Sequence, residues 1–475
     1  MAFDLVVANG DVVTPQGVVR CDVAVSGESI VALLPPGEAA AHDTMRTIDA
    51  TGRIVIPGGI DPHVHMKHHI VLPDGTRHYS KGPDHVGRAA LMGGTTTLMD
   101  FVLLQPGMGV PESIEARHAQ FADSCCDWSC HLMLYTDPSE RTFEELAEAI
   151  RAGYPTVKLF MTNILPKNQG RMIDFGDMWE TFRILSREGG MAVIHGEDND
   201  LVMHMYAKLL REGRTGFEHM SEVHSRLSED MSFRRVIRLA ENVPGTALYM
   251  MHVSASSGVT AVREARARGL PIYGETLHQY LVYTDEDYRR PNGQIYHTYP
   301  SLKGAEDQAV LWDGIASGDI HSVATDDLCC ALGLKLAANR IDDIVGGNVG
   351  VEPRIAVMYT EAVVRRGLSL ERFVDLVSTN AARILGLYPR KGAIAVGSDA
   401  DFAVLDPSRR GTIRASELYA SDYTPWEGHE IYAWPVATVM RGRVVMENGR
   451  FEGKPGDGRY LKRKISADIL AGAAL

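Results

Sequence analysis

Eight apolar runs, each followed by a stretch compatible with a helix, fill the middle of the chain and restrict its fold most strongly. The runs are 54–60, 95–101, 129–135, 156–162, 191–195, 247–254, 271–276 and 321–326. Continuous apolar runs that alternate with helices are typical of parallel strands buried on both faces. Eight such units predict a closed (β/α)8 barrel, with a doubly wound open sheet as the structural alternative.

Both ends of the chain differ from this middle, because short predicted strands alternate there with glycines. We therefore predict one small β-sandwich domain built from two segments, 1–53 and 390–456. The barrel would occupy 54–389, and 457–475 would form a C-terminal extension. We interpret the basic run 462–464 in this extension as a solvated face.

Charge and cysteine content limit the partners and the compartment. The formal net charge of −13 argues against nucleic acid or an anionic membrane as a partner. The six cysteines form no Cys-x-x-Cys pair, so we interpret them as free thiols in a reducing compartment. Residues 1–7 lack the features of a secretory signal, and we expect no membrane span. We expect a cytoplasmic protein that acts on a small molecule.

The strongest local signal is the pair His63 and His65. Alternate residues of a strand point to one face, so this pair presents two imidazoles to the same side. It lies at the end of the first predicted strand, where (β/α)8 barrels place their active sites. Taken alone, such a pair is as often exposed as metal-binding. We interpret His68, His69 and His78, which follow, as ordinary loop residues.

Further candidate ligands lie at the ends of later strands. His195 ends the fifth run, His252 lies near the end of the sixth, and Asp326 ends the eighth. A single histidine of this kind is more often a hydrogen-bonded core residue than a ligand. Imidazoles that converge with a carboxylate on one rim suit zinc, and also manganese, cobalt or iron.

Lys158 is unusual because it lies in the middle of an apolar run. An unpaired buried ammonium is costly, so this lysine must be paired, deprotonated or modified. One interpretation is an ion pair or a side chain that reaches solvent. The other is a deprotonated amine that has captured carbon dioxide, because the resulting carbamate has two oxygens that can bridge two metal ions.

Together these positions resemble the dihydropyrimidinase/hydantoinase branch of the amidohydrolase superfamily, over nearly the whole chain. The motifs that carry the resemblance include Gly58-Gly59-Ile60-Asp61-Pro62-His63-Val64-His65, Val157-Lys158-Leu159-Phe160-Met161, His195-Gly196-Glu197-Asp198, His252-Val253-Ser254 and Thr325-Asp326. The resemblance implies two divalent metal ions per chain, with zinc preferred and manganese or cobalt as alternatives. It implies the ligands His63, His65, Lys158 as a bridging carbamate, His195, His252 and Asp326.

The same resemblance implies hydrolysis of a C–N amide bond by a metal-bridging hydroxide, with Asp326 as the catalytic acid and base. Two metals about 3.5–4 Å apart lower the pKa of a bridging water and polarise the carbonyl. We expect a cyclic amide or ureide of the hydantoin or dihydropyrimidine type as substrate. The alternatives are an acyclic urea, carbamate or amide, such as an N-aryl urea, and a non-catalytic scaffold. The branch also implies a homotetramer.

Positions that contact the substrate in this branch are partly different here. Asn163 replaces a tyrosine, whereas Ser301 matches a serine of the branch. Its asparagine aligns with Gly346, and Asn348 lies close enough to substitute. We expect substrate contacts from Asn163, Ser301 and Asn348. Asp327, an additional carboxylate, would either raise the pKa of a neighbouring group or reject an anionic substrate, or else point away from the site.

Overall fold

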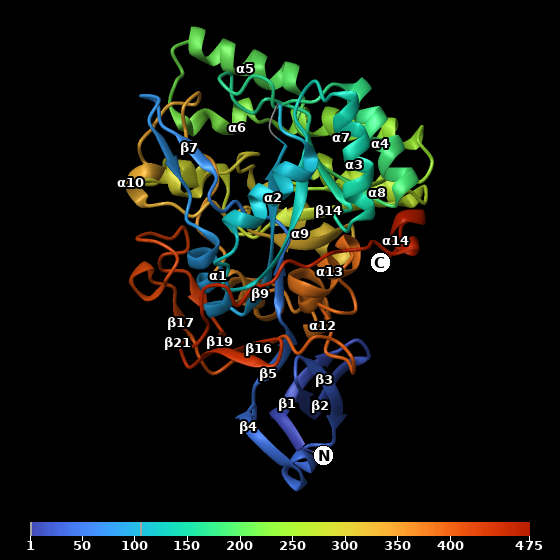
Figure 1. Ribbon diagram of the computed structural model, residues 1–475. Helices are drawn as coiled ribbons and strands as arrows, with labels where there is room; N and C mark the ends of the chain where they lie inside the picture. Colours follow the sequence, from blue (N-terminus) through green and yellow to red (C-terminus); the bar gives the residue numbers. More distant parts are fainter. Residues whose placement is uncertain (1, 105–106) are drawn as a thin grey trace.

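The larger part of the protein is a barrel of parallel strands surrounded by helices (Figure 1). The computed structural model describes residues 2–104 and 107–475. Its eight-stranded sheet consists of β6 (Gly59–Asp61), β9 (Thr95–Leu103), β10 (Asp127–Met133), β11 (Thr156–Phe160), β12 (Met191–His195), β13 (Ala247–Met250), β14 (Ile272–Leu277) and β15 (Ile320–Ala324). Neighbouring strands follow one another in chain order. The edge strands β6 and β15 meet through a parallel bridge between Val64 and Asp327. The predicted (β/α)8 barrel is confirmed.

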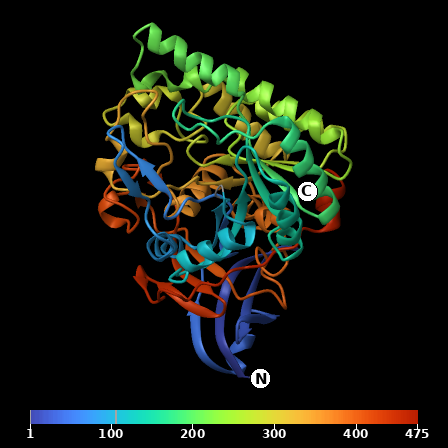
Figure 2. The ribbon, with the colours of Figure 1, turned by 45° about the horizontal axis from the view of Figure 1, so that its top comes forward.

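Helices occupy the connections between the strands. They are α1 (Pro83–Met92), α2 (Val110–Gln120), α3 (Glu140–Arg151), α4 (Phe175–Glu188), α5 (Asn199–Arg211), α6 (Met220–Val223), α7 (Arg226–Glu241), α8 (Ser256–Ala267), α9 (Ala305–Ser317), α10 (Leu332–Lys335), α11 (Arg354–Met358), α12 (Leu370–Val374) and α13 (Asn380–Leu385). Figure 2 shows α5 and α7, in green, at the opposite end of the molecule from the N-terminal strands. Within the described residues, no helix has both the length and the apolar character needed to cross a membrane.

The two ends of the chain form a second, nine-stranded sheet. Its strands are β1 (Ala2–Thr14), β2 (Gly17–Ser26), β3 (Ser29–Leu34), β4 (Asp43–Asp49), β5 (Ile54–Pro57), β16 (Phe402–Asp406), β19 (Trp434–Met440), β20 (Arg443–Glu447) and β21 (Arg450–Phe451). Strand β5 joins the two ends, because it pairs with β1 on one side and β16 on the other. Fully buried Val7, Val55, Phe402 and Val439 share one apolar core. The predicted β-sandwich from both termini is confirmed.

The first predicted barrel strand is in fact divided between the two sheets at Gly58. The N–H of Gly58 donates to the carbonyl of Asp401 at 2.9 Å, whereas the N–H of Gly59 donates to Gly94 at 2.9 Å. A Cβ at residue 58 would lie 2.2 Å from Oγ1 of Thr96, so the close passage past β9 requires glycine. The run 54–60 therefore contributes β5 to the terminal sheet and only β6 to the barrel. The proposed domain limits stay a prediction.

The C-terminal extension runs along the barrel and ends in helix α14 (Ala467–Ala471). Its basic run was expected to face solvent, but Arg463 is only 3% exposed. The guanidinium donates to Oγ of Ser129 and Oγ1 of Thr156, both at 2.7 Å, and to the carbonyls of Cys130 and Leu385. The interpretation as a solvated face is wrong for this residue, because strands β10 and β11 supply enough acceptors to bury it.

The contact between α1 and the end of the barrel provides a test of packing. A Cβ at residue 93 would lie 2.0 Å from the carbonyl oxygen of Glu352, which is backbone and cannot rotate away. We expect Gly93→Ala to lower the free energy of unfolding by about 2–3 kcal/mol. Gly333→Ala is the matched control, because nothing lies within 4 Å of a Cβ there. Equal melting temperatures for both variants in calorimetry would contradict this close contact between residue 93 and Glu352.

Candidate active site

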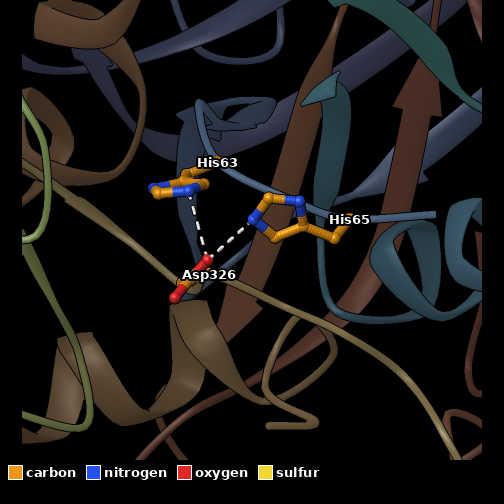
Figure 3. A group of neighbouring side chains, drawn as sticks. All are labelled: His63, His65 and Asp326. Atoms are coloured by element: carbon orange, nitrogen blue, oxygen red, sulfur yellow. Dashed lines mark hydrogen bonds and ion pairs between the residues drawn. The ribbon is translucent and has the colours of Figure 1, made fainter. Parts of the chain in front are cut away.

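His63 and His65 meet Asp326 where the first and last barrel strands come together (Figure 3). Nε2 of His63 lies 3.1 Å from Oδ1 of Asp326, and Nε2 of His65 lies 3.0 Å from the same oxygen. One ligand atom from each of the three residues fits within 4.8 Å of the others. Two imidazole nitrogens and one carboxylate oxygen at this spacing form a set of donors that suits a divalent metal ion.

Two buried glutamates hold the imidazoles in place. Oε1 of Glu275 lies 3.0 Å from Nδ1 of His63, and Oε2 of Glu197 lies 2.8 Å from Nε2 of His195. Both carboxylates are at most 1% exposed. Metal-binding histidines commonly donate one ring N–H to a carboxylate, which fixes the tautomer and leaves the other nitrogen free to bind.

A second group of predicted ligands faces the same space. Lys158 lies in β11, His195 ends β12, and His252 follows β13. The ring centres of His195 and His252 are 4.5 Å apart, and those of His63 and His252 are 5.4 Å apart. All six predicted ligands line one cavity of about 380 Å³. This volume suits a small organic substrate.

Burial keeps the histidines of this second group neutral. It lowers the pKa of His195 to about 4, although Glu197 acts in the opposite direction. Burial also lowers the pKa of His252 well below its ordinary value. Only a neutral imidazole has a lone pair to offer a metal. Burial alone would raise the pKa of Asp326, but His63 and His65 lower it below its ordinary value, so this carboxylate is ionised.

Lys158 has no acidic partner within ion-pair distance among the described residues. Its Nζ donates to Sδ of Met251 at 2.8 Å, and a thioether is a weak acceptor. The side chain is 1% exposed, which rules out an amine that reaches bulk solvent. Burial lowers the pKa of Lys158 to about 7, while Glu275 and Asp326 act to raise it. A substantial neutral fraction of the amine is therefore present near neutral pH.

Two of the candidate ligands have a backbone conformation that is rare outside glycine. His252 has φ 41° and Asp326 has φ 51°. Each lies two residues beyond the end of its strand, β13 or β15, and not within the strand as the apolar runs predict. Such conformations are costly and concentrate at functional sites, where the surrounding structure holds a side chain in position.

Comparison with known proteins agrees with this arrangement. The sequence model of the amidohydrolase family matches residues 54–445, which contain all six candidate ligands. The chain belongs to the amidohydrolase family.

This amidohydrolase is similar to characterised relatives over its full length. It is 32% identical to D-hydantoinase of Geobacillus stearothermophilus, across 98% of each chain. It is 30% identical to a D-phenylhydantoinase of Escherichia coli, across 97% of this chain and 98% of the relative. The dihydropyrimidinase structure from Brevibacillus agri matches with a TM-score of 0.91 and 32% identity, across 97% and 99% of the two chains. The amidohydrolase therefore lies in the dihydropyrimidinase/hydantoinase branch.

None of the three predicted substrate contacts is among the described residues that line the cavity. Oδ1 of Asn163 accepts the backbone N–H groups of Arg171 and Met172 at 3.1 and 3.0 Å. Oγ of Ser301 donates to the carbonyl of His224, and Asn348 is fully buried. The wall that the amidohydrolase presents is instead formed by His68, His69, Ile70, Val71, Ile164, Leu165, Arg171, Tyr299 and Gly346, among others.

Asp327 points away from the ligands. Its Oδ2 accepts the N–H groups of Gly350 and Val351 at 2.8 and 3.1 Å. The structure favours the interpretation in which Asp327 points away from the site and does not reject anionic substrates. Asp327 fixes a loop instead.

Glu197 and Glu275 were not predicted to belong to the site, although the sequence contains a signal for each. Glu197 is two residues from His195, and Glu275 is a carboxylate inside an apolar run, as unusual there as Lys158. His68 and His69 were interpreted as ordinary loop residues, but both line the cavity.

Proposed function

We propose that the protein is a metal-dependent hydrolase that opens a cyclic amide or ureide of the hydantoin or dihydropyrimidine type. The observation that carries the proposal is the convergence of His63, His65 and Asp326 with three further nitrogen donors on one cavity. Relatives named D-hydantoinase and a neighbour named dihydropyrimidinase support this substrate class. The acyclic and the non-catalytic alternatives are not favoured.

We propose two divalent ions per chain, with zinc preferred over manganese or cobalt. His63, His65 and Asp326 would hold one ion, and His195 and His252 the other. When bound, the ions lower the pKa of a water molecule and polarise the scissile carbonyl.

Lys158 would supply the bridge between the two ions as a carbamate. Its neutral amine adds through nitrogen to the carbon of carbon dioxide and releases one proton, which gives an anion with two oxygen donors. Support for this step comes from the buried position of Lys158, the absence of an acidic partner in the described chain, and its lowered pKa. The positive charges of the two ions would compensate the negative charge of the carbamate.

Asp326 is placed to move the proton of the reaction. Its Oδ1 faces His63 and His65, while Oδ2 accepts the Thr298 hydroxyl at 2.5 Å, so the carboxylate is fixed at both oxygens. We propose that it accepts a proton from the attacking water and delivers it to the leaving nitrogen.

We propose that Asn163, Ser301 and Asn348 influence the substrate indirectly. Asn163 holds the backbone of Arg171, and the carbonyl of Asn348 accepts the N–H of Leu328 at 2.9 Å. Arg171 and Leu328 both line the cavity. Asn163 stands at the position of the branch's tyrosine, but its Oδ1 accepts the backbone N–H groups of Arg171 and Met172. We therefore expect unsubstituted dihydrouracil to be a poorer substrate than a 5-substituted hydantoin.

Turnover by metal-loaded protein tests the proposed function. We expect hydantoins to be opened to N-carbamoyl amino acids, and we expect a chelator to abolish the reaction until zinc or manganese is restored. Chromatography of the products measures both effects, with His63→Ala as the inactive control. Cleavage of aryl ureas without any opening of hydantoin, dihydrouracil, allantoin or dihydroorotate would contradict the proposal.

We also propose a cytoplasmic homo-oligomer, with a tetramer as the state that the branch implies. Light scattering of the purified protein measures its mass in solution and tests the assembly.

A further inference from the structure

Arg171 is a cation on the cavity wall that, like Lys158, has no acidic partner in the described part of the chain. The guanidinium of Arg171 lines the cavity, and among the described residues no carboxylate lies within ion-pair distance of it. Lys167, also on this wall, differs because its Nζ lies 3.2 Å from Asp343. The loop that carries Arg171 is nevertheless well held, since the backbone N–H of Arg171 donates to Oδ1 of Asn163.

Arg171 lies beside the reactive groups. Its Cζ is 5.2 Å from the ring centre of Phe160, and Nζ of Lys158 is 5.0 Å from the same centre. The candidate ligand His195 is stacked on the same ring, with the ring centres 5.1 Å apart. A substrate whose amide reaches the metal ligands can therefore extend a substituent of a few atoms toward the guanidinium.

The surroundings of the Arg171 guanidinium suit the binding of an anionic ligand. Burial lowers the pKa of Arg171, and the groups that oppose this effect are the phenols of Tyr135 and Tyr299, not an acid. A guanidinium stays protonated under these conditions, so it is a half-buried charge without compensation. The same cavity wall contains the apolar residues Leu103, Ile164 and Leu165, and an ion pair is stronger in a less polar surrounding. Charge-assisted, bidentate binding of a carboxylate is the interaction that such an arginine makes best.

We propose that Arg171 binds an anionic group of the substrate, so that the preferred substrates are cyclic amides or ureides with an exocyclic carboxylate. This inference rests on the proposed function for the position of the ring. It concerns the substituent, and Arg171 is assigned no part in breaking the C–N bond.

A matched pair of substrates tests the inference. We compare kcat/KM for 5-(2-carboxyethyl)hydantoin with its neutral isostere 5-(2-carbamoylethyl)hydantoin. We expect the wild-type protein to prefer the acid by at least about 10-fold. Arg171→Gln is expected to lower kcat/KM for the acid by about 10- to 100-fold and to leave the amide within about 3-fold. Lys167→Gln is the control, and it should preserve the wild-type preference because Lys167 is already paired.

Other results would overturn the inference. An equal loss of kcat/KM for both substrates in Arg171→Gln would mean that the guanidinium contacts the substrate ring or stabilises the fold, and does not bind the carboxylate. Wild-type preference for the amide would overturn it even if the variant loses metal or fails to fold.

A binding measurement separates this inference from the proposed function. If neither compound is hydrolysed, calorimetric titration of metal-loaded protein with the acid and the amide still shows whether Arg171 binds the carboxylate. Tighter binding of the acid that disappears in Arg171→Gln would support the inference, and equal affinities would overturn it.

Discussion

Lys158→Ala is expected to lower kcat/KM by about 10³-fold or more, because the bridge between the two metal ions is lost and each ion retains fewer ligands. Elemental analysis should find about two metal ions per chain in the wild-type protein and at most about one in the variant. Short carboxylic acids such as propionate are expected to restore part of the activity, because their two oxygens can occupy the space of the missing carbamate.

Lys158→Arg is the control for charge. A guanidinium stays protonated and cannot add carbon dioxide, so neither metal content nor activity should recover in this variant. Full metal content in Lys158→Ala would contradict the bridge. So would an experimental structure with an unmodified ammonium at residue 158 beside the metals.

Asp326→Asn is expected to lower kcat by about 10²- to 10⁴-fold, the usual contribution of a positioned acid or base. The amide keeps an oxygen for the metal but cannot carry the proton. Metal content should fall less than in Lys158→Ala.

Asp327→Asn provides the matched comparison, because Asp327 is the adjacent carboxylate and contacts the loop at Gly350 and Val351. We expect it to change thermal stability more than kcat. If the two variants lose kcat equally, the proton-carrying role of Asp326 is wrong. Steady-state kinetics and melting curves of both proteins decide the matter.

The barrel and its candidate ligands could be predicted because they depend on local pattern. A strand buried on both faces must be apolar throughout, so Lys158 was conspicuous in β11. Histidines at strand ends converge whenever parallel strands close into a barrel, whatever the loops do. This reasoning located His63, His65 and His195 without any knowledge of the connecting segments.

Other features of the structure could not be predicted, because they depend on which distant parts of the chain meet in space. No periodic pattern in the sequence indicates such contacts. Nothing in the run 54–60 shows that the hydrogen bonds change from one sheet to the other at Gly58. The burial of Arg463 depends on acceptors more than 300 residues earlier in the chain. Arg171 is an irregular loop residue, and its position follows from the path of the loop, not from a repeat.

The pairing of β5 with β16 has a consequence for synthesis of the protein. Pro57 pairs with Phe402, about 345 residues later in the chain. At ordinary rates of translation, strand β5 waits roughly 20–70 s for this partner while the ribosome completes the barrel. During that interval the edge of β5 is unpaired and open to other nascent chains. Slow growth at low temperature does not shorten this wait, so co-expression of a chaperone that covers exposed strands is the better route to high yields of intact enzyme.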